Sequence, residues 1–169
     1  MIHIYNISSI YVQWMPPPPY WLKMNIDGSS NGQIGGIGIV IRNEFGGFIA
    51  GLSKQVGKVT NDMAELWAIK DGLQTMSRLG VRQVQVESDS TFAIGAVSGS
   101  INYAWCFRPL VNDCKKIMES MSVVFLYVYR EANKPADFLA KRSLHQDNVV
   151  SNWCVTPDLE LGMLLTNNG

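Results

Sequence analysis

Four acidic residues, far apart in the chain, each lie where a predicted element begins or ends. Asp27 closes an apolar strand and Asp89 follows another. Glu65 and Asp137 lie in the first turns of two predicted helices. Taken singly, each has a simple structural explanation, because acidic residues suit turns, helix caps and the N-terminal ends of helices. Their neighbours, however, are apolar, and a carboxylate at the edge of a core is costly unless it is paired or bound to a metal.

The four carboxylates together point to a chemistry that none of them indicates alone. If the fold gathers them, their mutual repulsion raises their pKa values, and a divalent cation removes that penalty. Hard oxygen ligands, with water completing an octahedron, select Mg²⁺ or Mn²⁺. The candidate catalytic and metal-ligating residues are therefore Asp27, Glu65, Asp89 and Asp137.

The first half of the chain predicts the elements that must position Asp27 and Glu65. Apolar runs and turn residues predict three short strands, at 21–26, 34–42 and 48–56, which form an antiparallel meander. The hydrophobic period then changes from two to near 3.6, which predicts a long helix at 63–76. Thr60, Asn61 and Asp62 suit its start, and Gly80 suits its end.

The second half predicts alternation of strand and helix. Strands are expected at 84–86 and 123–129, and helices at 91–97, 105–121 and 133–142. A hairpin block followed by strand–helix alternation predicts an α/β fold, with a mixed five-stranded sheet and helices on both faces.

Composition shifts along the chain predict three segments. Four consecutive prolines at 16–19 favour a rigid, extended spacer, so residues 1–19 are expected to be a leader and proline-rich linker. Residues 20–145 are expected to form the domain. Residues 146–169 form a C-terminal extension, which we expect to pack as an appendage or to contact a partner.

Composition also excludes several classes of protein. With 47% hydrophobic and 17% charged residues, the chain is expected to fold around a core. No stretch approaches the roughly 18 apolar residues of a membrane helix, and residues 1–12 make a poor secretory signal. The three cysteines lack metal-ligand spacing, which favours reduced thiols and an intracellular protein, without separating nucleus from cytoplasm.

The charge distribution gives only a weak indication of the partner. The net charge is zero, yet all 14 basic residues and only 11 of the 14 acidic ones lie between Lys23 and Arg142. This span is therefore mildly basic, which by itself does not predict binding to a polyanion.

Four motifs in order give the chain its family resemblance. They are Asn-Ile-Asp-Gly-Ser at 25–29, Met-Ala-Glu-Leu-Trp-Ala at 63–68, Val-Glu-Ser-Asp-Ser at 86–90 and Arg-Glu-Ala-Asn-Lys-Pro-Ala-Asp-Phe-Leu-Ala-Lys at 130–141. Over about residues 14–142 the chain resembles type 1 ribonuclease H. It is most similar to the plant reverse-transcriptase-like ribonuclease H domains, which occur alone or at the end of non-LTR retroelement polyproteins.

The resemblance implies a metal-dependent endonuclease that hydrolyses the RNA strand of an RNA–DNA hybrid, leaving 5′-phosphate and 3′-hydroxyl ends. It implies two Mg²⁺ ions, with Mn²⁺ as a substitute. Asp27 would be shared by both ions, Asp137 would join it on one, and Glu65 and Asp89 on the other. Gly28, Ser29, Thr60, Asn61 and Asn133 would contact the substrate. We expect a monomer with no membrane association and, in a parent retroelement, a former polymerase domain.

Departures from the family pattern leave other functions open. Arg130 and Glu131 occupy a short connection where bacterial members carry a histidine, Asp62 stands where an asparagine is common, and a basic protrusion is missing. A catalytically silent, retroelement-derived nucleic-acid-binding module is therefore the main alternative, and an integrase-like nuclease is another. A phosphate-binding α/β domain would need a glycine-rich strand-to-helix turn, but the glycines at 32–38 lie within a strand pattern.

Overall fold

The computed structural model describes residues 13–146 and 151–167. Within them, six strands form one sheet in the order β5-β4-β1-β2-β3-β6. The strands are β1 (Leu22–Ser30), β2 (Gly35–Arg42), β3 (Phe48–Gly57), β4 (Gln83–Ser88), β5 (Ser122–Tyr127) and β6 (Ser151–Cys154). The α-helices are α1 (Asn61–Arg78), α2 (Thr91–Ser98), α3 (Arg108–Met118), α4 (Lys134–Ser143) and α5 (Leu159–Asn167). Two short 3₁₀ helices, η1 (Trp105–Phe107) and η2 (Arg130–Ala132), precede α3 and α4.

The sheet is mixed, with β1 near its centre. The β1–β2 and β2–β3 pairs are antiparallel, whereas β4 pairs in parallel with both β1 and β5. The predicted α/β fold with a mixed sheet and helices on both faces is confirmed. The sixth strand was not predicted, because β6 has only four residues and forms by pairing with the edge of β3.

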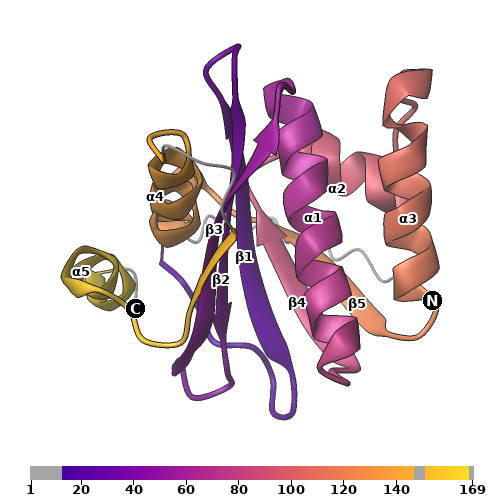
Figure 1. The fold of residues 1–169 in the computed structure, drawn as a ribbon. Coiled ribbons are helices and arrows are strands. Elements are labelled where there is room, and N and C mark those ends of the chain that lie inside the picture. Colours follow the sequence, from indigo (N-terminus) through magenta and orange to yellow (C-terminus); the bar gives the residue numbers. More distant parts are fainter. Residues whose placement is uncertain (1–12, 147–150, 168–169) are drawn as a thin grey trace.

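Helices cover the two faces of the sheet, as Figure 1 shows, with α1, α2 and α3 on one side and α4 and α5 on the other. Successive residues of a strand point to opposite faces, so β2 divides its side chains between them. Ile37, Ile39 and Ile41 are buried in the larger core with α1. Gly36 and Gly38 face α4, and a Cβ on Gly38 would lie only 2.0 Å from the carbonyl oxygen of Ala136. The glycines of this strand therefore let α4 pack directly on the sheet.

Local sequence accounts for where α1 begins and ends. Thr60 is its N-cap, and its hydroxyl accepts a hydrogen bond from the backbone N–H of Met63. Gly80 follows the helix with a φ of +75°, a left-handed conformation that favours glycine. Both ends agree with the sequence prediction.

One predicted helix is shorter in the structure. Residues 105–121 were expected to form a single helix, but α3 ends at Met118 and η1 occupies the first three residues. Pro109 lies at the start of α3, where its missing backbone N–H costs no hydrogen bond.

The segments before β1 and after α4 both contact the domain. The Trp14 side chain is buried, with 6% of its surface exposed, and its ring lies against the guanidinium of Arg42. On the C-terminal side, Leu161 of α5 is fully buried against Val40 and Leu139. Across residues 13–146 and 151–167, no helix has the length and apolar character needed to cross a bilayer.

Candidate active site

The structure brings together three of the predicted carboxylates. Asp27 lies on β1, Glu65 in the second turn of α1, and Asp89 directly after β4. Because β1 and β4 are parallel neighbours, their carboxyl ends meet at one edge of the sheet. One carboxylate oxygen from each of these residues lies within 4.8 Å of the other two. We call Asp27, Glu65 and Asp89, together with the adjacent Asp137, the carboxylate cluster.

Asp137 lies beside this group, in the first turn of α4. Its carboxyl interacts with Asp27, where it raises the pKa of that residue through its charge and a side-chain hydrogen bond. The same carboxylate accepts a hydrogen bond from Nζ of Lys141, one turn further along α4, at 2.8 Å. All four predicted acidic residues are therefore neighbours, although they come from four different elements.

The electrostatics of the cluster favour a bound cation. Burial, followed by the charges of Asp89 and Asp137, raises the pKa of Asp27 to about 8. Burial and the charge of Asp27 also raise the pKa of Glu65 well above its usual range. These carboxyls resist ionisation while no positive charge compensates them.

Glu65 supplies a second sign that the cluster fits a metal ion. Its Oε2 atom is buried and has no hydrogen-bond partner among the described residues. Buried oxygens without partners are rare in folded proteins, and a cation is one of the groups that can satisfy them. A set of carboxylate oxygens suits Mg²⁺ or Mn²⁺ better than softer metals. The residues present therefore fit a divalent cation.

The residues expected to contact substrate have defined structural contacts. Thr60 caps α1, and Oδ1 of Asn61 accepts a hydrogen bond from the backbone N–H of Ser30 at 2.7 Å. Gly28 lies in β1, where α1 approaches closely, and Ser29 follows it, half-buried. Gly28 and Ser29 directly follow Asp27, whereas Thr60 and Asn61 lie at the start of α1. The contact of all four residues with substrate stays a prediction.

Asn133, the fifth predicted substrate contact, is buried, with only 1% of its surface exposed. Its side-chain amide donates to the carbonyl oxygen of Ile26 at 2.8 Å. The structure thus places Asn133 beneath the cluster, between β1 and α4.

Sequence reasoning assigned no role to three exposed side chains next to the cluster. The Arg130 side chain is 79% exposed, and its Nε lies 3.4 Å from Oδ2 of Asp89. Tyr127 and Tyr129 are exposed as well, with their rings 5.6 Å apart. Tyr127 pairs with Ser88 across β4 and β5, which places it at the same edge of the sheet as Asp89. The available signal in the sequence was that Tyr127 and Tyr129 lie just before the last motif, of which Arg130 is the first residue.

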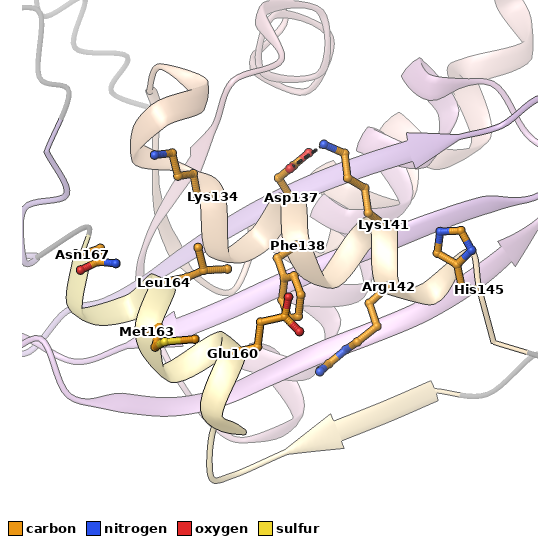
Figure 2. A pocket seen from close by; sticks show the side chains of 10 residues that line it. All are labelled: Lys134, Asp137, Phe138, Lys141, Arg142, His145, Glu160, Met163, Leu164 and Asn167. Carbon is orange, nitrogen blue, oxygen red and sulfur yellow. Dashed lines mark hydrogen bonds and ion pairs between the residues drawn. The ribbon is translucent and has the colours of Figure 1, made fainter.

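A groove of about 680 Å³ lies between α4 and α5 and reaches the cluster at Asp137. Figure 2 shows that it has an apolar floor, where Phe138 and Leu164 lie, and charged residues along its rim. The rim carries both signs of charge, since Glu160 lies among the basic residues, and Arg142 pairs with Asp158.

The fold and the site together define a class of protein. A mixed sheet with three antiparallel strands, two further parallel strands and a cluster of carboxylates at their shared edge is the architecture of the ribonuclease H-like proteins. Solved structures agree: ribonuclease H1 of the archaeon Halobacterium salinarum superposes with a TM-score of 0.70 at 23% identity, covering 73% of this chain and 97% of its own. The LC11 ribonuclease H1, isolated from compost and solved with an RNA/DNA hybrid, gives a TM-score of 0.67 at 26% identity, covering 72% and 95%.

The sequence narrows this class further. Residues 25–143 match the family model described as reverse transcriptase-like. A protein of Arabidopsis thaliana whose name places it among the ribonuclease H proteins is 30% identical over 156 residues. That match covers 90% of this chain but only 25% of the Arabidopsis protein, so this chain spans about a quarter of its relative's length. The chain belongs to the reverse transcriptase-like family, and it contains a type 1 ribonuclease H domain.

Proposed function

We propose that this chain is a metal-dependent endonuclease that hydrolyses the RNA strand of RNA–DNA hybrids. The observation that carries the proposal is the carboxylate cluster, in which Asp27, Glu65 and Asp89 meet with Asp137 beside them. The LC11 ribonuclease H1, solved with an RNA/DNA hybrid, shares this fold and supports the assignment of substrate.

In the proposed mechanism, Asp27, Glu65, Asp89 and Asp137 hold two Mg²⁺ ions, for which Mn²⁺ can substitute. When bound, the two ions would activate the attacking water and neutralise charge at the leaving oxygen. Asp27 has a central position, because the charges of both Asp89 and Asp137 act on its carboxyl. The cluster is rigidly supported, since β1 and β4 are hydrogen-bonded to each other and α1 packs against β1.

We propose that Gly28, Ser29, Thr60 and Asn61 border the path of the RNA strand. Gly28 and Ser29 follow Asp27 in β1, and Asn61 is tied to the same strand through Ser30. Selection of RNA requires contacts with its 2′-hydroxyl groups across a wide minor groove, and polar groups of this kind can make them. Arg130, exposed beside Asp89, is placed to interact with a phosphate.

We also propose that the domain is related to retroelement polyproteins and uses a single copy for catalysis. Membership of the reverse transcriptase-like family and the longer Arabidopsis relative support the first part. All four carboxylates come from one chain, which supports the second.

The test is cleavage of an end-labelled RNA–DNA hybrid with Mg²⁺ or Mn²⁺. We expect the parent protein to cut the RNA strand, Asp27→Asn to abolish cutting, and RNA–RNA and DNA–DNA duplexes to stay intact. Asp113→Asn is a matched control, because Asp113 is an acidic residue of α3 that pairs with Lys70 and lies outside the cluster. Hybrid binding without cleavage at any metal concentration would favour a catalytically silent nucleic-acid-binding module instead.

A further inference from the structure

Beneath the carboxylate cluster lies a set of buried polar side chains that the proposed reaction does not use. No member has more than 6% of its surface exposed. Its members, which we call the buried polar network, are Trp14, Lys23, Asn25, Arg42, Glu87 and Asn133.

Asn25 is the centre of this network. Its Nδ2 atom donates to Oε2 of Glu87 at 2.8 Å and to Oδ1 of Asn133 at 3.3 Å. Its Oδ1 atom accepts from Nε1 of Trp14 at 2.9 Å and from Nη2 of Arg42 at 3.3 Å. Both donors and both acceptor positions of the amide are therefore used, which fixes its orientation.

The charged members of the network are costly to bury. Nζ of Lys23 lies 2.5 Å from Oε1 of Glu87 and also donates to the carbonyl oxygen of Met15. The Arg42 guanidinium lies 3.6 Å from the centre of the Trp14 ring. Replacing a buried ion pair by apolar residues often leaves stability unchanged or higher, so such pairs are weak evidence for a stabilising role. This network therefore calls for an explanation other than stability.

Asn133 links the network to two members of the carboxylate cluster. Its side-chain Nδ2 donates to the carbonyl oxygen of Ile26, the residue before Asp27, at 2.8 Å. Its backbone carbonyl accepts from the backbone N–H of Asp137 at 3.1 Å. One residue thus contacts both the strand that carries Asp27 and the helical turn that carries Asp137.

The network also reaches β4, the second strand of the site. Glu87 lies in β4, two residues before Asp89, and is held there by Lys23 and Asn25 of β1. The hydrogen bonds of the buried polar network therefore join β1, β4 and α4, which are three of the four elements that carry the cluster.

We propose that Asn133, oriented by Asn25, is a positioning residue that sets the spacing between the carboxylates of Asp27 and Asp137. Its role in metal binding rests on the proposed function. Trp14, which precedes β1 in the chain, is also a member of the network. The segment before β1 therefore contributes to the same positioning role. The Asn133 amide acts through the backbone of Ile26 and the first turn of α4, without touching substrate.

The test compares Asn133→Ala with Gln55→Ala. Gln55 is an equally suitable buried amide, because its Nε2 donates to the carbonyl oxygens of Ser143 and Gln146 at the other end of α4. The affinity for Mn²⁺ is measured by calorimetry, and the melting temperature of each metal-free variant is measured in parallel. Substitution of a residue that orients metal ligands typically lowers metal affinity by about 10- to 100-fold.

We expect both variants to lose stability, but only Asn133→Ala to weaken Mn²⁺ binding by roughly tenfold or more. In hybrid cleavage, Asn133→Ala should lower kcat with little change in KM. A gentler variant, Trp14→Phe, keeps an aromatic ring over Arg42 and removes one hydrogen bond to Asn25. Trp14→Phe should weaken Mn²⁺ binding several-fold while its melting temperature stays nearly unchanged. This variant tests the positioning role even if Asn133→Ala does not fold.

The outcomes separate the two proposals. If the parent binds Mn²⁺ and Asn133→Ala or Trp14→Phe binds it equally well, the positioning role is wrong and the proposed function stands. Equal weakening by Asn133→Ala and Gln55→Ala would also overturn it, because the effect would then be general loss of stability. A parent protein that neither binds Mn²⁺ nor cuts the hybrid would overturn the proposed function itself.

Discussion

A Cβ atom added to Gly28 would lie 2.3 Å from the backbone nitrogen of Glu65. This separation is far below van der Waals contact, and backbone cannot rotate out of the way as a flexible side chain can. Glycine at this position therefore lets α1 approach β1 closely enough for Glu65 to reach Asp27.

Gly28→Ala is expected to push α1 away from β1 and to disrupt the carboxylate cluster. We expect a loss of about 2–4 kcal/mol in the free energy of unfolding, since overpacking against backbone is severe. Denaturant unfolding measures this loss. Gly162→Ala is the control, because a Cβ there meets nothing within 4 Å, and alanine within α5 should stabilise by up to about 1 kcal/mol. Equal stability of Gly28→Ala and the parent would contradict the close approach.

Asp27→Asn is expected to raise the melting temperature of the metal-free protein near neutral pH while it abolishes cleavage. Burial and neighbouring charges raise the pKa of Asp27 from 3.8 to about 8. At a pH below the pKa of Asp27 in the unfolded chain, the carboxyl is protonated in both the folded and the unfolded state, so it does not reduce the free energy of unfolding. The loss in the free energy of unfolding grows as the pH rises from 3.8 towards 8, and it stops growing above that range.

Calorimetry in a chelator should therefore show a gain of roughly 2–6 °C for Asp27→Asn at about pH 8, which shrinks towards zero at about pH 4. A gain of the same size at both pH values would show that charge is not its cause.

Divalent cations are expected to stabilise the parent protein against heat. A ligand that binds only the folded state adds about 2.7 kcal/mol at a concentration 100 times its Kd. Since Mg²⁺ binds ionised carboxylates, the rise in melting temperature should be larger at about pH 8 than at about pH 5. Differential scanning fluorimetry with and without Mg²⁺ measures this rise, and Glu65→Gln should lose most of it. An undiminished rise in that variant would place the bound ion elsewhere.

Arg130→Ala is expected to weaken hybrid cleavage without unfolding the protein. The Arg130 side chain is 79% exposed beside Asp89, so its loss should shift the melting temperature little. The loss of one cation that interacts with a phosphate should reduce the slope of binding against log salt concentration by about one. Fluorescence anisotropy with a labelled hybrid in Ca²⁺ measures this slope.

Arg82→Ala is the matched control for that experiment. Arg82 is an exposed arginine that directly precedes β4, at the opposite end of that strand from Asp89. Its side chain donates to the carbonyl oxygen of Ser120. Its removal should leave the salt dependence unchanged, and an equal effect of both variants would indicate nonspecific attraction.

Two of the three cysteines, Cys106 and Cys114, are expected to differ sharply in reactivity. Cys106 is exposed, whereas Cys114 is fully buried, and burial raises the pKa of the Cys114 thiol to about 12. A thiol needs its thiolate form to react, so Cys114 should resist maleimide in the folded protein and react after denaturation. Mass spectrometry of the labelled peptides measures this, and rapid labelling of Cys114 would contradict its burial.

Much of the fold followed from local sequence patterns. The apolar run at 34–42 predicted a strand, and the structure places Ile37, Ile39 and Ile41 of that strand in one core. Thr60 and Gly80 predicted the ends of α1 correctly. Both signals depend only on neighbours in the chain, which is why sequence alone was enough.

Features that depend on tertiary contacts were not predicted. The proline run indicated a spacer, yet Trp14, two residues before it, is buried through contacts with Asn25 and Arg42. The strand β6 forms only because an edge of the sheet is available to it. The proximity of Asp27, Glu65 and Asp89 was expected from their motifs, but the distances between their carboxylates and the raised pKa of Asp27 depend on the three-dimensional packing.

The pairing of β6 with β3 also bears on how this protein behaves in concentrated solution. An uncovered strand offers its N–H and C=O groups to any other chain, and such edges promote aggregation. Here Asn152 and Trp153 pair with Ser53 and Leu52, so the hydrogen-bonding groups on this part of β3 are taken up within the molecule. By pairing with β3, the C-terminal strand β6 is therefore expected to reduce self-association of the protein along this edge of the sheet.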